Sequence, residues 1–313
     1  MHAFSMIRGT LMLAAALLLC PPAHAQLFRA YLAVNGNDAN PCTLPAPCRL
    51  LPAALNAVSD GGEIWMLDSA NYNTTTVTIA KSVTILAVPG VQGSVIAVGG
   101  PAISITASGL KVTVRNLVIA PLAGGGGTVG ISMTGASALA VERCLLTGLP
   151  GRGIDAVGDG TVDVLDSTVR DGGTWAIYLR NGITATLAGL RIMGNAGGII
   201  AYGSAPSLTT AVISDSVISG GSHGVIAQVT VAGADANVTV TRSTVERTTG
   251  YGIFARTETV GTATVAIGGS TVANNERAWG IFNTGAAIQS LGNNQANGNL
   301  FGNTGTPVPL APF

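Results

Sequence analysis

The stretch Val238–Val245, V-T-V-T-R-S-T-V, decides the fold because its pattern occurs seven times along the chain. Each copy has apolar residues at its first, third and eighth positions, and a small or apolar residue at its sixth. The steps between successive copies are 27, 23, 23, 26, 27 and 27 residues, and a repeat of this period indicates a solenoid. The copies begin at Val112, Leu139, Val162, Ala185, Ala211, Val238 and Val265.

Within each copy, alternation of apolar and polar residues predicts a strand, and the gap between the third and sixth positions predicts a bend. A Gly or Ala followed by Ile or Val recurs later in each copy, as in Gly224-Val225 and Gly252-Ile253. Several short strands per repeat, with Gly and Asn at the corners, predict an all-β fold, a right-handed parallel β-helix of about nine to ten coils. Less regular opening copies begin at Ile64 and Val83.

The two ends of such a solenoid need caps, because an open coil exposes unpaired strand edges. Residues 49–62 have helical spacing and end in a Gly pair, so we expect a short N-terminal capping helix there. Residues 291–313 are rich in Asn, Gly and Pro and are expected to form a C-terminal cap and tail. The expected organisation is therefore a loop and capping helix over 26–62, the β-helix over 63–290, and this tail.

The first 25 residues have the features of a signal peptide, with Arg8 before the apolar run Leu11–Leu19. The A-x-A site places cleavage between Ala25 and Gln26, which predicts a secreted or periplasmic protein. A lipoprotein anchored through Cys20 is the alternative. No later stretch reaches the roughly 20 apolar residues of a transmembrane segment.

The composition narrows the partners. Charged residues make up 10% of the chain and the formal net charge is +0, with no basic stripe, so a nucleic-acid partner is not expected. Cys42 and Cys48 lie between prolines in an exported chain and are expected to form a local disulfide, since a metal site would need a second ligand pair. Cys144 occupies the inward sixth position and is expected to be a buried, unreactive thiol.

With the repeat, the opening block Asn35–Leu55 (NGNDANPCTLPAPCRLLPAAL) and the first-coil motif Thr78–Ile85 (TIAKSVTI), the chain resembles a known family. It is similar to the pectate-lyase-like superfamily of right-handed parallel β-helix proteins, in particular its secreted bacterial members. The resemblance covers most of residues 30–300. Its motifs are specific for the fold and not for one chemistry, because this scaffold carries many activities.

His223, the only histidine after the leader, lies in Ser222–Val225, S-H-G-V, which is similar to the G-H-G element of polygalacturonases. That family also uses N-T-D, D-D and R-I-K elements, and the first two are missing here, while the only R-I precedes His223. Tyr251–Phe254 begins like the Y-G-x-D-P-H element of alginate epimerases, but no Asp-Pro-His follows. His223 and Arg256 therefore stay weak catalytic candidates.

Pectate and pectin lyases use an Arg or Lys base, commonly beside an acidic calcium site. The one acidic cluster here lies within Gly151–Gly173, where Asp163 and Asp166 flank a bend and Arg143 is expected one coil before Asp166. These two carboxylates are further weak catalytic candidates. We expect no cofactor and no metal; calcium held by this cluster is the alternative, and a surface ion-pair ladder would explain it as well.

Large side chains fall into two adjacent columns of the repeat. Strand alternation points the second column outward, and the first faces inward or lies at a corner. Successive large apolar groups on an outer face are uncommon on a monomer without a reason, which is either cover by loops or the tail, or a binding role. The binding candidates from the two columns are Trp175, Tyr178, Tyr251, Phe254, Trp279 and Phe282.

The regular repeat, the aromatic columns and the lack of an assembled catalytic set favour a secreted surface module that binds a polysaccharide or a cell-envelope component. The alternative is a polysaccharide lyase or glycoside hydrolase with an atypical active site around His223, Tyr251, Arg256 or the acidic cluster, and the sequence does not decide whether the protein is an enzyme. A third interpretation is a purely structural, adhesin-like rod.

Overall fold

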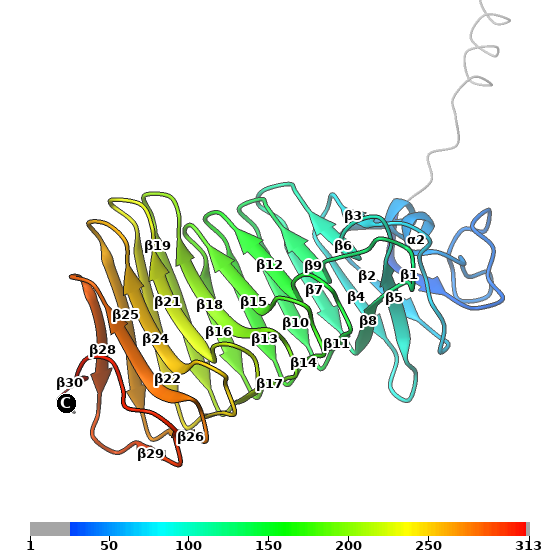
Figure 1. The fold of residues 1–313 in the computed structure, drawn as a ribbon. Coiled ribbons are helices and arrows are strands. Elements are labelled where there is room, and N and C mark those ends of the chain that lie inside the picture. Colours follow the sequence, from blue (N-terminus) through cyan, green and yellow to red (C-terminus); the bar gives the residue numbers. More distant parts are fainter. Residues whose placement is uncertain (1–25, 311–313) are drawn as a thin grey trace, which may run out of the picture.

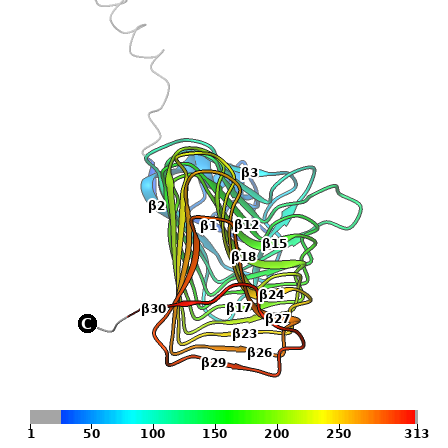
Figure 2. The same cartoon turned by 60° about the vertical axis from the view of Figure 1, so that its left-hand side comes forward.

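A computed structural model describes residues 26–310, which form a rod of stacked coils (Figure 1). The expected signal peptide and the alanine of its cleavage site lie outside the described residues. Three parallel sheets run along the rod, and the chain passes through sheet 1, sheet 2 and sheet 3 in turn within each coil (Figure 2). This confirms the right-handed parallel β-helix. Over residues 26–310, eight coils contain strands of all three sheets, slightly fewer than the nine to ten expected.

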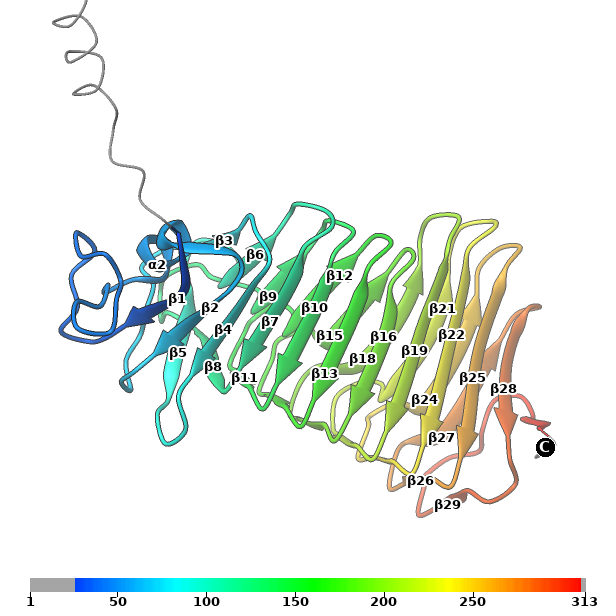
Figure 3. The same ribbon diagram turned by 180° about the vertical axis from the view of Figure 1, so that it is seen from behind.

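Sheet 1 is the longest, with 12 strands among the described residues, and it faces the viewer in Figure 3. Its strands are β1 (Leu27–Leu32), β2 (Val58–Met66), β4 (Val83–Ala87), β7 (Lys111–Arg115), β10 (Ala138–Glu142), β13 (Thr161–Leu165), β16 (Thr184–Ala188), β19 (Leu208–Ser214), β22 (Asp235–Thr241), β25 (Thr262–Gly268), β28 (Ala286–Ser290) and β30 (Val308–Pro309).

Sheets 2 and 3 have nine strands each over the same residues. Sheet 2 consists of β5 (Gly93–Ala97), β8 (Leu117–Pro121), β11 (Leu145–Thr147), β14 (Thr168–Arg170), β17 (Arg191–Met193), β20 (Val217–Ser219), β23 (Thr244–Glu246), β26 (Thr271–Ala273) and β29 (Gln295–Asn297). Sheet 3 consists of β3 (Val77–Ile79), β6 (Ile103–Ile105), β9 (Ile131–Met133), β12 (Ile154–Val157), β15 (Trp175–Arg180), β18 (Gly197–Gly203), β21 (Val225–Val229), β24 (Tyr251–Thr257) and β27 (Arg277–Phe282).

The bend between sheets 1 and 2 is made by one residue in the left-handed region, such as Asn116 (φ 56°) or Asp166 (φ 49°). The next residue, the sixth of each copy, then points into the core, as the repeat predicted. Six such residues are buried: Leu117, Cys144, Ser167, Leu190, Ser216 and Ser243.

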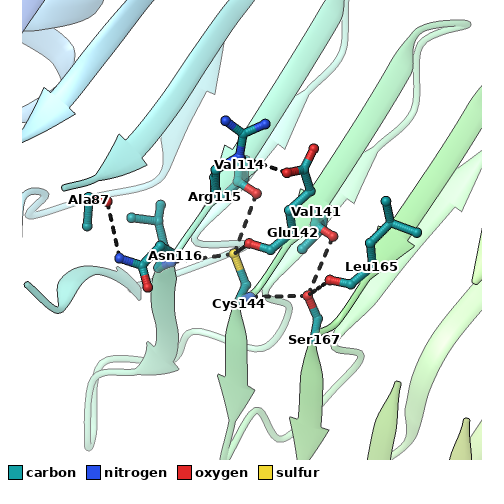
Figure 4. A network of polar contacts seen from close by, with 10 residues as sticks. Ala87, Val114, Arg115, Asn116, Val141, Glu142, Cys144, Leu165 and Ser167 are labelled. Carbon is teal, nitrogen blue, oxygen red and sulfur yellow. Dashed lines mark hydrogen bonds and ion pairs between the residues drawn. The ribbon is translucent and has the colours of Figure 1, made fainter. Parts of the chain in front are cut away.

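The polar members of this inward column bond from coil to coil (Figure 4). The Ser167 hydroxyl accepts a hydrogen bond from the Cys144 backbone N–H (3.1 Å) and donates one to the Leu165 carbonyl (2.8 Å). Cys144 is buried as expected, and burial raises the pKa of its thiol to about 11. The column therefore satisfies backbone groups that the bend leaves without sheet partners.

The N-terminal end is closed by α2 (Leu51–Ala57), the only helix among residues 26–310, which buries Leu51, Ala54 and Leu55. The helix ends before the predicted Gly pair, because Val58 is already extended and begins β2. Residues 27–32, expected to be loop, instead form β1, the first strand of sheet 1. The predicted Cys42–Cys48 disulfide is present beside this cap.

The C-terminal end is closed by the segment that follows β28. Its asparagine side chains accept hydrogen bonds from backbone N–H groups of the preceding coil, for example Asn294 Oδ1 from Ser270 (2.9 Å) and Asn299 Oδ1 from Asn275 (3.0 Å). The Asn-rich composition thus replaces the missing next coil.

Candidate functional site

The outer face of sheet 3 carries a continuous band of aromatic and apolar side chains, which we call the sheet 3 strip. Its members come from five successive strands, β15, β18, β21, β24 and β27. The strip consists of Trp175, Tyr178, Ile200, Tyr202, His223, Ile226, Tyr251, Phe254 and Phe282.

The floor of the strip is an outward column in strict register. Tyr178 pairs with Ile200, Ile200 with Ile226, and Ile226 with Phe254. Although these residues point away from the core, Ile200 and Ile226 are each 3% exposed and Phe254 is 8% exposed. The column is therefore outward, as the alternation predicted, but it is covered by its own neighbours.

The cover consists of rings that lie flat along the sheet. The indole of Trp175 extends over Gly197, its pairing partner on the next coil. Farther along the strip, the rings of Tyr251 and Phe282 meet over Gly280. These glycines have no side chain at the positions that the rings occupy. The half-buried rings at the surface of the strip therefore present their faces to solvent.

Ring contacts connect the strip from coil to coil. The centroid distance is 5.7 Å between Tyr178 and Tyr202, and 5.3 Å between Phe254 and Phe282. Such pairs contribute about 0.5–1.5 kcal/mol each beyond the area that they bury. The rings therefore fix one another in place.

His223 is part of this packing. Its ring stacks on Tyr251 at 5.9 Å and meets Phe254 edge-on at 5.0 Å. Burial lowers the pKa of His223 below its ordinary value, because the charged form loses hydration. The sequence placed His223 and Tyr251 in one column that was inward or at a corner, and both lie at the corner, on the outer side.

Charged groups flank the strip at its N-terminal end. Asp155, which pairs with Tyr178 on the next coil, bonds to Arg152 Nη1 (2.6 Å) and Arg180 Nη2 (3.1 Å). The two guanidinium groups lie 4.1 and 5.2 Å from the Tyr178 ring centroid. Burial raises the pKa of Tyr178 despite these cations. The Nε atom of Arg180 is buried and has no hydrogen-bond partner among the described residues.

Trp279 does not belong to the strip, which corrects its predicted position. Matching Gly280-Ile281 to Gly252-Ile253 implies a step of 28 residues, but Ile253 pairs with Trp279, a step of 26. Arg277 therefore lies opposite Tyr251, and Phe282 lies beside Arg256 instead of continuing the Phe254 column. Trp279 packs against the main core instead. The reason is that no further coil follows, so a large side chain turns inward to close the core.

The other catalytic candidates do not converge. Asp163 and Asp166 are exposed on and just after β13 of sheet 1, whereas His223 and Arg256 belong to sheet 3. Among the ion pairs of residues 26–310, Arg143 and Asp166 do not form one. In the same range, no group of three or more His, Cys, Asp and Glu residues is placed to hold a metal ion.

Arg256 borders the strip on a polar edge. Its Nη2 lies 3.1 Å from Glu258 Oε1, which also accepts a hydrogen bond from Gln228 Nε2 at 3.3 Å. Gln228 and Arg256 are neighbours in register. Hydrogen-bonding groups therefore lie next to the exposed rings.

The sequence analysis missed Tyr202 and Arg180 as parts of this surface. Both lie two residues after the outward column, so strand alternation could have found them. Each points to the same face as the residue two before it. Their contacts with Tyr178 depend on side-chain rotamers, which alternation does not specify.

The family model described as right handed beta helix region matches residues 101–301. No curated protein matches this sequence. Among the residues that the structure describes, no helix has the length and apolar character needed to cross a bilayer.

Solved structures share the fold. Pectate lyase Pel9A is 16% identical with a TM-score of 0.67, over 92% of this chain and 78% of that one. A complex of XylC with xylose is 10% identical with a TM-score of 0.55, over 84% and 68%. An alginate lyase from Paenibacillus sp. str. FPU-7 is 13% identical with a TM-score of 0.53, over 90% and 100%. Identities this low show the fold alone.

Proposed function

The chain belongs to the family of right-handed β-helix proteins, and from that premise we propose that it is a secreted module that binds polysaccharide through the sheet 3 strip. The similar solved structures include a pectate lyase, an alginate lyase and a protein bound to xylose, which supports a carbohydrate ligand. The disulfide supports an oxidising, extracytoplasmic compartment.

The observation that carries the proposal is the set of half-buried rings that lie flat over Gly197 and Gly280. A flat aromatic face packs against the C–H face of a sugar ring at little cost in conformational entropy. The neighbouring Gln228, Arg256 and Glu258 offer donors and acceptors for hydroxyl groups. Few precisely placed polar groups beside apolar contacts are typical of ligand sites.

Binding without turnover is favoured because the titratable groups of the strip are engaged with each other. Asp155 is shared by Arg152 and Arg180, and His223 is packed between rings. The second candidate function is a polysaccharide lyase or glycoside hydrolase with its site at the N-terminal end of the strip. The Arg152–Asp155–Arg180 group against Tyr178 is the observation that favours it.

The test is affinity electrophoresis of the mature protein in gels that contain pectin, alginate or xylan. We expect retardation by at least one polymer, and about tenfold weaker binding or more in Trp175→Ala and Tyr202→Ala, since each removes about 1–3 kcal/mol of contact. Val212→Ala on the outer face of sheet 1 is the matched control and should be retarded like the wild type.

The same polymers are assayed for new reducing ends and unsaturated products. Cleavage that is lost in Arg180→Ala would replace the binding module by the enzyme. Equal retardation of the wild type, the two strip variants and the control would place any glycan contact outside the strip and sink the proposal.

A further inference from the structure

We propose a second binding site, for a small apolar molecule about the size of a benzene ring, at the C-terminal end of the core. A pocket of about 120 Å³ lies there beneath the tail. It is on the interior side of the coils, away from the sheet 3 strip. It is lined by Ile253, Ile267, Val272, Trp279, Ile288, Ser290, Asn294, Gln295, Ala296 and Pro307.

The pocket exists because the two ends of the rod are closed differently. At the N-terminal end, α2 inserts Leu51 and Leu55 into the core. At the C-terminal end the tail offers mainly Ala296 and Pro307 to the same core. These side chains are too small to fill the cross-section of a coil, so Ile253, Val272 and Ile288 of the last coils keep an unfilled apolar space above them.

Trp279 forms the wall of the pocket and is held by the tail. Its indole Nε1–H donates to the Gly305 carbonyl (3.2 Å), and its backbone N–H donates to Asn303 Oδ1 (3.1 Å). The side that faces the pocket is therefore a fixed aromatic surface.

The polar groups of the lining are already satisfied. Asn294 Nδ2 donates to the Ile267 carbonyl (2.9 Å) and to Ser290 Oγ (3.0 Å), while its Oδ1 accepts from Ser270 N–H. A water molecule needs two to four polar partners to be stable in such a place. These residues have few left to offer, so the pocket suits an apolar ligand better than water.

The size fits a single ring. An apolar cavity of about 150 Å³ in another protein stays dry and binds benzene or xenon. Gln295 and Ala296 of the last strand of sheet 2 are exposed, which gives a ligand access from the end of the rod.

Toluene is the probe, added to the full mature chain. We expect a saturable rise in Tm, because a ligand that binds only the folded state stabilises it by mass action. In a ¹H–¹⁵N spectrum, the indole N–H of Trp279 should shift with toluene while those of Trp65 and Trp175 do not. This readout locates the site without any substitution.

Ala296→Leu should fill the pocket, abolish the toluene-dependent rise in Tm and leave the protein folded. Ala266→Leu, the same change on the outer face of sheet 1, should keep the response. No shift at Trp279, or an equal response in Ala296→Leu, would overturn the site. Toluene binding that appears only in Phe313→Ala would also overturn it as a ligand site, because the chain's own terminal ring would then be the occupant.

Discussion

The indole of Trp175 lies over Gly197, the residue that pairs with it on the next coil. A methyl group at Gly197 would come within 2.9 Å of the indole Cδ2. At the other end of the strip, Gly280 leaves the same kind of space for Tyr251 and Phe282. The strip therefore depends on two residues that have no side chain.

Gly197→Ala should force the Trp175 ring off the sheet or strain the backbone beneath it. We expect a loss of about 1–3 kcal/mol in the free energy of unfolding, as for other overpacked sites. Chemical denaturation followed by tryptophan fluorescence measures it. Gly302→Ala is the matched control, because nothing lies within 4 Å of a methyl group there. Equal stability of the two variants would mean that the indole does not need the space over Gly197.

Ser167→Ala tests the inward column between sheets 1 and 2. The change leaves the buried N–H of Cys144 without its acceptor, which should cost about 1–3 kcal/mol in the free energy of unfolding. Thr168→Ala, one residue later and half-buried, should change it by about 0.5 kcal/mol or less. Urea denaturation compares the two, and a neutral Ser167→Ala would show that water or a backbone shift satisfies Cys144.

The repeat carried enough information for the coil and for this column. Cys144, Ser167 and Ser216 were expected to point inward from their sixth position alone, and all three are buried. The reason is geometric: one left-handed residue after a strand reverses which side the next residue faces. That effect depends on local backbone conformation, which the pattern of each copy specifies.

The pattern did not specify register at the last coil or the orientation of the rings. The Gly-Ile motif pointed to a 28-residue step, and the chain uses 26 because Trp279 is needed inside. Ile200 and Ile226 were expected outward, and their cover was left open. That cover comes from rings on neighbouring coils, whose rotamers depend on contacts between residues distant in sequence.

The Cys144 thiol should make stability fall at alkaline pH. Its pKa is raised by burial from 9.0 to about 11, so the unfolded chain releases this proton first as pH rises. The free energy of unfolding should drop by about 2–3 kcal/mol between pH 9 and pH 11 through this group. Cys144→Ser, which keeps a hydroxyl like those of Ser167 and Ser216, should lack that part of the decrease.

Urea denaturation of the wild type and Cys144→Ser at pH 8, 9.5 and 11 isolates the thiol from other groups that titrate there. A parallel fall in the two proteins would show that Cys144 is not desolvated in the folded state. Under native conditions a thiol reagent should react with Cys144 only as fast as the chain unfolds.

His223 should titrate below pH 6.5. Burial between Tyr251 and Phe254 lowers its pKa, and the closest cation of the strip, Arg277, lies on the Tyr251 ring at 5.6 Å. Because the unfolded chain takes up the proton first, stability should fall as pH drops from 6.5 through the folded-state pKa. The single His ring signal of the mature chain can be followed by ¹H NMR. Tyr251→Ala should expose the ring and move its midpoint up toward 6.5, while Tyr31→Ala, on β1, should leave it unchanged. A wild-type midpoint at or above 6.5 would contradict the buried position of His223 in the strip.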